Sequence, residues 1–342
     1  MTLEEFLDTW HSPSETLLVH TSGSTGTPKP MLVEKRRMLN SAKITCDFLG
    51  LKPGDAALLC MSLDYIAGKM MVVRSIERSL KLISVKPSGH PLSAESLKNA
   101  NDAAWKQGIT FAAMVPMQVY NTLQVPEERE RLTHIKHLII GGGAIDSALE
   151  AELRSFSGDI AIWSTYGMTE TLSHIALRRI NGKEASEWYQ PFDSVKVSQT
   201  EEGCLVIDAP LVCKQPLVTN DIVEIQPYIY NKVCAEGVRF RIKGRKDNVI
   251  CSGGIKIQIE EVENLLKPHL QKPFMLAKKK DEKFGEIAVL LTEDGDLKKV
   301  EATVRRLLSD NSKKYWIPRE YIHVESLPLT ETGKPKRACL LR

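Results

Sequence analysis

The stretch "HTSGSTGTPKP" at residues 20–30 combines glycines, hydroxyl side chains and one lysine. Gly23 and Gly26 permit positive φ and leave backbone N–H groups uncovered, which suits phosphate oxygens. Further donors are the hydroxyl groups of Thr21, Ser22, Ser24, Thr25 and Thr27. Lys29 adds a positive charge that attracts a polyphosphate. The stretch therefore predicts a phosphate-binding loop, although a polar surface turn has a similar composition.

This loop is not the mononucleotide P-loop, in which lysine directly follows the second glycine. Here Thr27 and Pro28 separate Gly26 from Lys29. The short apolar runs "LLVH" at 17–20 and "MLVEK" at 31–35 flank the loop. They predict one strand that enters the loop and another that leaves it.

Apolar runs alternate with amphipathic stretches from Leu17 to about Ile180. Further strands are expected at 55–62, 80–86, 109–115, 137–142 and 159–164. Helices are expected at 37–50, 93–108 and 146–156. This alternation predicts an α/β fold, with a large domain built on a mostly parallel sheet that helices cover on both faces.

The sequence pattern changes after about Trp188, where short segments rich in β-forming residues end in glycine or proline. The pieces at 194–199, 204–210 and 221–230 predict a small β subdomain that completes the large domain. A charged, glycine-containing segment at 239–248 could mark a boundary. Beyond it, strands at 274–280 and 286–292 with helices at 259–267 and 297–308 predict a smaller C-terminal α+β domain.

Composition and charge narrow the class of protein. The 342 residues are 42% hydrophobic and 26% charged, and the net charge of +3 is too small to indicate a nucleic-acid or membrane partner. The seven cysteines are scattered without a Cys-x-x-Cys pair. The acidic start "MTLEEFLDTW" is unlike a signal peptide, and no apolar run is long enough to cross a membrane. We therefore expect a soluble cytoplasmic enzyme without membrane insertion.

The glycine loop resembles the signature Thr-Ser-Gly-Ser/Thr-Thr-Gly-x-Pro-Lys-Gly of the acyl-adenylate-forming enzymes, which include acyl-CoA ligases, peptide-synthetase adenylation domains and luciferases. Pro30 replaces the final glycine of that signature. Five further stretches resemble the family's later motifs in the same order, at residues 139–146, 164–171, 218–225, 244–263 and 328–337. This resemblance extends over nearly the whole chain and implies ATP as a co-substrate.

In "IIGGGAID" the resemblance places Gly142 and Gly143 beside the adenine. In "STYGMTET" (164–171) it implies that Tyr166 stacks on the base, with Gly167 and Met168 in the same motif. It also implies that Thr169 meets the phosphate and that Glu170 holds magnesium and serves in catalysis. The plainer alternatives are a core aromatic for Tyr166 and a solvated carboxylate for Glu170.

The resemblance further implies that Asp221 and Arg245 bind the ribose hydroxyls, with Asn220 replacing a glycine of the family motif. These two residues could instead form a structural ion pair. In "PLTETGKPKR" (328–337) the resemblance implies that Lys334 is the catalytic lysine, whereas in isolation it would be one cation of a basic tail.

The family's architecture implies a core domain at 1–244, a hinge at 245–247 that contains Asp247, and a mobile C-terminal domain at 248–342. In the first step the acid's carboxylate attacks the α-phosphate of ATP and expels pyrophosphate, with Lys334 bridging the reacting groups. A thiol, coenzyme A, then attacks the acyl adenylate. Ser252, Gly253 and Gly254 would line the path of coenzyme A, or the glycines form a plain turn.

The stretch "MSLDYIAGKMMVVRSI" (61–76) resembles the short, Bacteroidetes-type 2-succinylbenzoate:CoA ligases of menaquinone biosynthesis. A helix is expected at 66–76, and the resemblance places Arg74 where a cation faces the succinyl carboxylate. Lys69 is a second candidate for this role. The alternative is that Arg74 is an ordinary surface residue of a helix. A dicarboxylic aromatic acid needs a cationic partner, because a buried unpaired carboxylate costs several kcal/mol.

Family members commonly carry a long segment before the glycine loop, whereas about twenty residues precede it here. The face that this segment would cover must then be polar, be covered otherwise, or be buried in a homodimer. Two alternatives to the succinylbenzoate ligase stay open. One is a ligase for another aryl or acyl acid, and the other is a non-catalytic nucleotide-binding remnant, suggested by Pro30 and Asn220.

Overall fold

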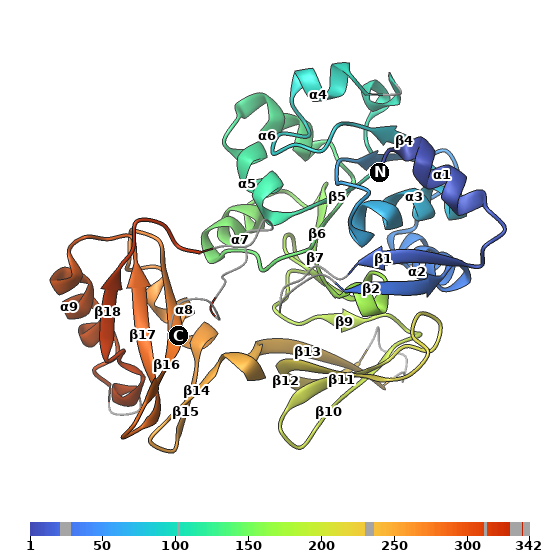
Figure 1. Cartoon of the computed structure of the whole chain (residues 1–342). Helices are drawn as coiled ribbons and strands as arrows, with labels where there is room; N and C mark the ends of the chain where they lie inside the picture. Colours follow the sequence, from blue (N-terminus) through green and yellow to red (C-terminus); the bar gives the residue numbers. More distant parts are fainter. Residues whose placement is uncertain (21–28, 101–102, 230–235, 311–312, 329–336, 338–342) are drawn as a thin grey trace. The chain divides into compact units, whose positions relative to one another are not determined.

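The computed structural model describes the chain except residues 21–28, 101–102, 230–235, 311–312, 329–336 and 338–342 (Figure 1). The chain forms two compact units. The first comprises Met1–Ser198, Val206–Leu217 and Ile225–Phe240. The second comprises Gln199–Leu205, Val218–Glu224 and Arg241–Arg342.

Within the described residues, seven strands form the main sheet of the first unit, in the order β4-β3-β5-β6-β7-β8-β9. Their bounds are β3 Ala56–Leu59, β4 Lys81–Ser84, β5 Phe111–Met114, β6 His137–Ile140, β7 Ala161–Gly167, β8 His174–Arg179 and β9 Gln190–Pro191. The strands from β4 to β7 pair in parallel, which confirms the predicted α/β fold. β8 and β9 add antiparallel pairs, since only a short turn joins β7 to β8.

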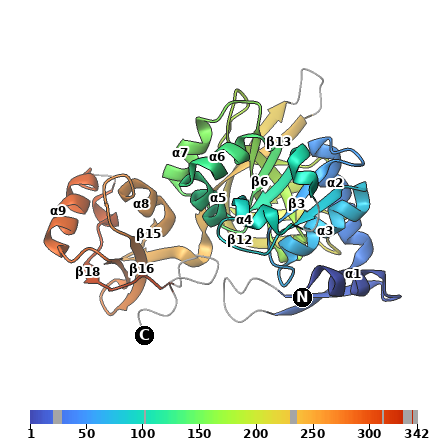
Figure 2. The ribbon, with the colours of Figure 1, turned by 90° about the horizontal axis from the view of Figure 1, so that it is seen from above.

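Helices cover this sheet on both faces (Figure 2). On one side lie α4 Ala94–Lys98, α5 Pro116–Leu123, α6 Pro126–Thr133 and α7 Ser147–Arg154. Their apolar residues share a core with alternate strand residues such as Leu58, Ala112 and Leu138. On the other side lie α2 Lys35–Leu49 and α3 Ile66–Arg78. This arrangement confirms the expected two covered faces.

One predicted helix, at 93–108, is wrong as a continuous element. α4 ends at Lys98, and the 3₁₀ helix η1 covers Ala103–Gln107. Asn99 caps α4, and asparagine favours helix ends because its side chain competes for backbone hydrogen bonds.

The strands that flank the glycine loop lie apart from the main sheet. β1 Thr16–His20 and β2 Pro30–Glu34 pair antiparallel as a two-stranded sheet, with Leu18 opposite Leu32. Leu18 and Leu32 are exposed, whereas Leu17, Val19 and Val33 are buried. This alternation is typical of a sheet with one solvent face and not of a strand buried in a parallel sheet.

The N-terminal helix α1, Leu3–His11, was not predicted. The hydroxyl of Thr2 accepts a hydrogen bond from the Glu5 backbone N–H, and the Glu5 side chain accepts one from the Thr2 N–H, which completes a capping box. Phe6 and Trp10 are buried. The helix is therefore held by both its cap and its apolar face.

The predicted β-rich region forms a four-stranded sheet of the described residues, in the order β10-β11-β12-β13. The strands are β10 Lys196–Gln199, β11 Cys204–Asp208, β12 Leu217–Ile229 and β13 Glu236–Arg245. A short 3₁₀ helix, η3 at Lys246–Asn248, follows β13.

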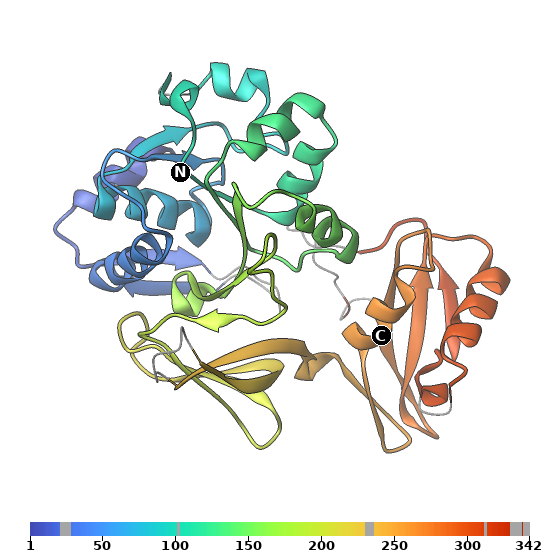
Figure 3. The same cartoon turned by 180° about the vertical axis from the view of Figure 1, so that it is seen from behind.

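The C-terminal part of the second unit is the expected α+β arrangement (Figure 3). Its strands are β14 Val249–Ser252, β15 Ile255–Gln258, β16 Phe274–Asp281, β17 Gly285–Thr292 and β18 Glu320–His323. Its helices are α8 Ile259–Leu266, α9 Leu297–Leu307 and the 3₁₀ helix η4 Lys314–Trp316. Leu276 and Leu290 pack with both α8 and α9, whereas their neighbours Met275 and Val289 belong to a second apolar cluster. Among the described residues, no helix is both long and apolar enough to span a bilayer.

The glycine at position 68 allows α3 to approach the preceding segment closely. A Cβ atom at Gly68 would lie 2.3 Å from the Ser62 carbonyl oxygen. We predict that Gly68→Ala lowers the free energy of unfolding by about 1–3 kcal/mol through overpacking. At an unstrained helix position the same change would stabilise the fold by about 1 kcal/mol.

Urea unfolding followed by circular dichroism checks this prediction. Gly158→Ala is the matched control, because a Cβ atom there meets nothing within 4 Å. Equal unfolding midpoints for the two variants would contradict the steric explanation.

Candidate active site

The glycines after β6 lie at the carboxyl end of the parallel strands, where α/β sheets commonly bind ligands. A Cβ atom at Gly141 would lie 2.4 Å from the hydroxyl oxygen of Thr165 in β7, so this glycine permits a close approach. Gly142 has a φ of 80°, which favours glycine. Gly142 is exposed and Gly143 is half-buried. The segment therefore offers accessible backbone beside the end of β7.

Tyr166 lies near the end of β7 and is 7% exposed. Its ring packs edge-on against Phe240, with centroids 5.1 Å apart, and lies 5.9 Å from the Tyr189 ring. A Cβ atom at the next residue, Gly167, would lie 2.3 Å from the Ser173 carbonyl oxygen. β7 can therefore end against the start of β8 only because residue 167 lacks a side chain.

The turn between these strands carries the remaining residues of the Tyr-Gly-x-Thr-Glu motif. The 3₁₀ helix η2 covers Thr169–Thr171, and Leu172 follows with a φ of 65°. The Thr171 hydroxyl lies 3.0 Å from the Met168 N–H and 2.7 Å from the Ser173 carbonyl oxygen, which ties the turn together. Thr169 is buried and the Glu170 side chain is exposed. A carboxylate is thus presented at the surface of a rigid turn.

Two groups of predicted residues fall outside the described part of the chain. These are the glycine-loop residues Thr21, Ser22, Gly23, Ser24, Thr25 and Gly26, and the terminal residue Lys334. Lys29 lies directly before β2 and is exposed. Arg337 donates to the Leu276 carbonyl at 3.1 Å and to a Glu263 carboxylate oxygen at 2.5 Å.

In the second unit, Arg245 connects the two aspartates predicted beside it. Its guanidinium donates to both carboxylate oxygens of Asp247, at 3.0 and 2.9 Å, and to Asp221 at 3.2 Å. Partial burial acts to raise the pKa of Asp247, but the hydrogen bonds and charge of Arg245 outweigh it and hold this pKa below its usual range. The predicted hinge residue is therefore in direct contact with the predicted ribose-binding residue. The hinge itself stays a prediction.

Ser252 ends β14, and Gly253 and Gly254 join this strand to β15, with which it pairs antiparallel. Gly253 and Gly254 have φ values of 56° and 85°, the combination that a tight two-residue hairpin requires. Both glycines are exposed, and the Gly253 N–H donates to the Phe284 carbonyl at 2.8 Å. The segment is a hairpin turn, and its proposed contact with coenzyme A stays a prediction.

Arg74, in α3, is 2% exposed, so the alternative of a surface residue is wrong. One Nη atom donates to the Ser173 hydroxyl oxygen at 2.5 Å, and the other lies 3.7 Å from the Met71 sulfur. Among the described residues, Nε has no hydrogen-bond partner and no carboxylate lies within ion-pair distance of the guanidinium. Burial lowers the pKa of Arg74 to about 10, which still leaves it charged at neutral pH.

Lys69, the second candidate, is also buried but its ammonium group is engaged locally. It donates to the carbonyl oxygens of Leu63 at 2.5 Å and Asp64 at 3.3 Å, in the segment just before α3. Burial lowers its pKa, and the charge of Asp64 opposes that shift. These contacts give Lys69 a role in holding the start of α3.

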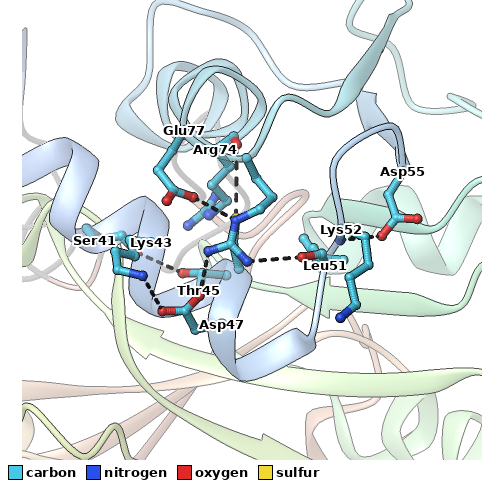
Figure 4. A network of polar contacts seen from close by, with 11 residues as sticks. Ser41, Lys43, Thr45, Asp47, Leu51, Lys52, Asp55, Arg74 and Glu77 are labelled. Carbon is cyan, nitrogen blue, oxygen red and sulfur yellow. Dashed lines mark hydrogen bonds and ion pairs between the residues drawn. The ribbon is translucent and has the colours of Figure 1, made fainter.

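Polar contacts fix α3 against α2 near Arg74 (Figure 4). Asp47 of α2 accepts hydrogen bonds from Lys43 at 2.9 Å and from Arg78 of α3 at 2.5 Å. The Cys46 thiol lies 4.0 Å from the Arg74 carbonyl oxygen. The position of the Arg74 backbone is therefore set by both helices.

Ser173, which the fold brings to Arg74 across 99 residues of chain, was not predicted as a site residue. The available signal was its place three residues after Glu170, the last residue of the Tyr-Gly-x-Thr-Glu motif. Only the packing of α3 against the turn before β8 reveals the pairing.

The unpaired charge of Arg74 predicts an effect on stability. Arg74→Met keeps a long side chain and removes a buried cation, so we expect the free energy of unfolding to rise by about 1–3 kcal/mol. Arg78→Met is the control. Arg78 is paired with Asp47 and Glu77, and its loss should lower stability. Urea unfolding at neutral pH measures both, and a lower unfolding midpoint for Arg74→Met than for the unaltered chain would contradict the prediction.

Comparison with known proteins identifies the family of this chain. A family model described as AMP-binding enzyme matches residues 8–208, more than half of the chain. The 2-succinylbenzoate–CoA ligase of Bacillus mycoides is 23% identical, over 97% of this chain and 71% of that protein. A plipastatin synthase protein of Bacillus subtilis is 25% identical over 94% of this chain, which spans only 13% of that protein's length.

Solved structures with a similar fold come from the same class of enzymes. The chain resembles O-succinylbenzoate coenzyme A synthetase from Bacillus subtilis, solved with AMP, in fold, with a TM-score of 0.71 at 21% identity over 94% of this chain and 68% of that one. An acyl-CoA synthetase (AMP-forming)/AMP-acid ligase II-like protein from Dyadobacter fermentans is 31% identical, with a TM-score of 0.61. That match covers 98% of this chain and 91% of the other. The chain belongs to the AMP-binding enzyme family.

Proposed function

We propose that this enzyme is an AMP-forming acid:CoA ligase that converts 2-succinylbenzoate to 2-succinylbenzoyl-CoA. The buried Arg74 guanidinium carries the proposal, because it needs an anionic partner that the described residues do not supply. It contacts Ser173, directly beyond the turn that holds the predicted nucleotide residues Thr169 and Glu170. An acid with two carboxylates could place one on Arg74 and offer the other to ATP.

In the first step a carboxylate oxygen attacks the α-phosphate and pyrophosphate leaves. Catalysis of such a step rests mainly on positioning and on stabilisation of charge at the phosphoryl oxygens. The residues at 21–26 and Lys29 would hold the β- and γ-phosphates, and Lys334 would bridge carboxylate and α-phosphate. Gly142, Gly143 and Tyr166 would border the base, and Asp221 and Arg245 the ribose.

Glu170 would hold magnesium. An exposed carboxylate suits this cation, which commonly binds through one or two carboxylates together with substrate phosphates and water. Among the described residues no group of three potential metal ligands occurs. When bound, magnesium would offset negative charge on the phosphates.

In the second step the thiol of coenzyme A attacks the acyl adenylate and AMP leaves. Asp247 would serve as the hinge about which the C-terminal domain turns, removing Lys334 and presenting residues 252–254. Its bidentate contact with Arg245 supports this role, since rotation at Asp247 would act directly on a residue at the ribose. The cytoplasmic location and the homodimer stay predictions.

A panel of acids tests the assignment. AMP release with ATP, magnesium and coenzyme A should be fastest with 2-succinylbenzoate. Arg74→Met should raise KM for this acid by about tenfold or more, the loss of a charge-assisted hydrogen bond, with little change for benzoate. Faster turnover of benzoate or a fatty acid would select another acid:CoA ligase. ATP binding without acid-dependent pyrophosphate exchange would select the non-catalytic remnant.

Lys334→Ala separates the two half-reactions. We expect adenylation to fall a hundredfold or more, about 3 kcal/mol of lost transition-state stabilisation. Thioester formation from preformed acyl adenylate should persist, because Lys334 is not needed in that step. Quench-flow assays of each half-reaction measure both rates, and equal losses would refute this division of labour.

A further inference from the structure

A series of hydrogen bonds, partly buried at Ser173, runs from α2 to the Arg74 guanidinium. His174 begins β8 and is 7% exposed. Its Nε2 lies 3.1 Å from the Thr45 hydroxyl in α2, and its Nδ1 lies 3.2 Å from the Ser173 hydroxyl. Ser173 in turn accepts from Arg74 of α3 at 2.5 Å. Three elements of the first unit therefore meet through one imidazole ring.

The partners of this series fix the direction of each hydrogen bond. The Thr45 hydroxyl donates to the Ser41 carbonyl at 3.1 Å, an interaction drawn in Figure 4, so we assign its oxygen as the acceptor of a hydrogen bond from His174. Nε2 therefore carries the proton and Nδ1 accepts from the Ser173 hydroxyl. The Ser173 oxygen is then left to accept from Arg74. In this arrangement the hydroxyl hydrogens of Thr45 and Ser173, the Nε2 hydrogen of His174 and one Nη2 hydrogen of Arg74 each have an acceptor.

The surroundings favour a neutral imidazole. Burial, and then the charge of Arg74, hold the pKa of His174 well below its usual range. The His174 ring also packs on Phe192, with centroids 5.6 Å apart. A neutral ring can orient the Ser173 hydroxyl without neutralising the charge of Arg74. A carboxylate at this place would instead form an ion pair with the guanidinium.

We propose that His174 is a positioning residue that acts through Ser173 to hold the Arg74 guanidinium ready for the carboxylate of the acid. This inference rests on the proposed function, which assigns Arg74 to the acid. It extends that assignment by identifying the residues, His174 and Ser173, that orient the buried Arg74 guanidinium without supplying an anionic partner. The Ser173 contact uses an Nη2 hydrogen and leaves the Nε hydrogen without a partner among the described residues.

Steady-state kinetics with 2-succinylbenzoate tests the proposal. His174→Phe keeps a ring but removes both polar atoms, and should raise KM for the acid about tenfold while KM for ATP and kcat change little. His174→Gln retains one acceptor and one donor and should restore most of the affinity. Ser75→Ala is the control, because it removes another buried hydroxyl of α3 that donates only to the Met71 carbonyl. It should leave KM for the acid unchanged.

A double variant separates this proposal from the proposed function. Once Arg74→Met has raised KM for the acid, adding His174→Phe should raise it no further, because both changes remove the same interaction. An additive effect, or an equal rise in KM for ATP, would overturn the positioning role and leave the assignment of Arg74 intact. If Arg74→Met alone leaves KM for the acid unchanged, the assignment of Arg74 fails and the positioning role fails with it.

The unaltered enzyme provides a readout that does not depend on activity. Nitrogen NMR of ¹⁵N-histidine-labelled protein, with the His174 signals identified by their loss in His174→Gln, should show a protonated Nε2 and an unprotonated Nδ1 at neutral pH. A proton on Nδ1, or on both nitrogens, would overturn the proposal even if every variant folds poorly.

Discussion

The parallel pairing of β5, β6 and β7 is the constraint on which the candidate site of the first unit depends. Parallel strands end at one edge, so the glycines after β6 and Tyr166 of β7 are delivered to the same place. The backbone at this edge is tightly packed, since Cβ atoms at Gly141 or Gly167 would lie within 2.4 Å of neighbouring atoms. Side-chain size at these two positions therefore decides whether the edge can form.

A second feature of the candidate site is electrostatic, the buried charge of Arg74. A guanidinium enclosed by α3 and the turn before β8 is an unfavourable feature for folding and a favourable one for recognising an anion. The surrounding packing overcomes that penalty through buried apolar residues of the same helix, including Met70, Val72 and Val73. Local destabilisation at Arg74 and the proposed recognition of an acid thus have the same physical origin.

The sequence predicted elements with strong local signals. α2 ends at Leu49 and is capped by Gly50, whose φ of 65° suits the glycine that predicted the stop, and α3 covers the expected segment. α1 was missed although Thr2 and Glu5 have capping-box spacing. The separate β1–β2 sheet and the pairing of Arg74 with Ser173 depend on long-range packing, which no local pattern encodes. The motif roles of Asp221 and Lys334 came from family resemblance alone.

Because the charge of Arg74 is unpaired, an anionic ligand that binds it would stabilise the native state. A ligand that binds only the native state shifts the unfolding equilibrium by mass action. An acid that pairs with Arg74 would offset the free-energy penalty of the buried unpaired charge. The fraction of native protein would then rise with the concentration of that acid. Cellular proteases act on opened chains. The lifetime of this protein would then lengthen whenever its acid accumulates, without a dedicated regulator.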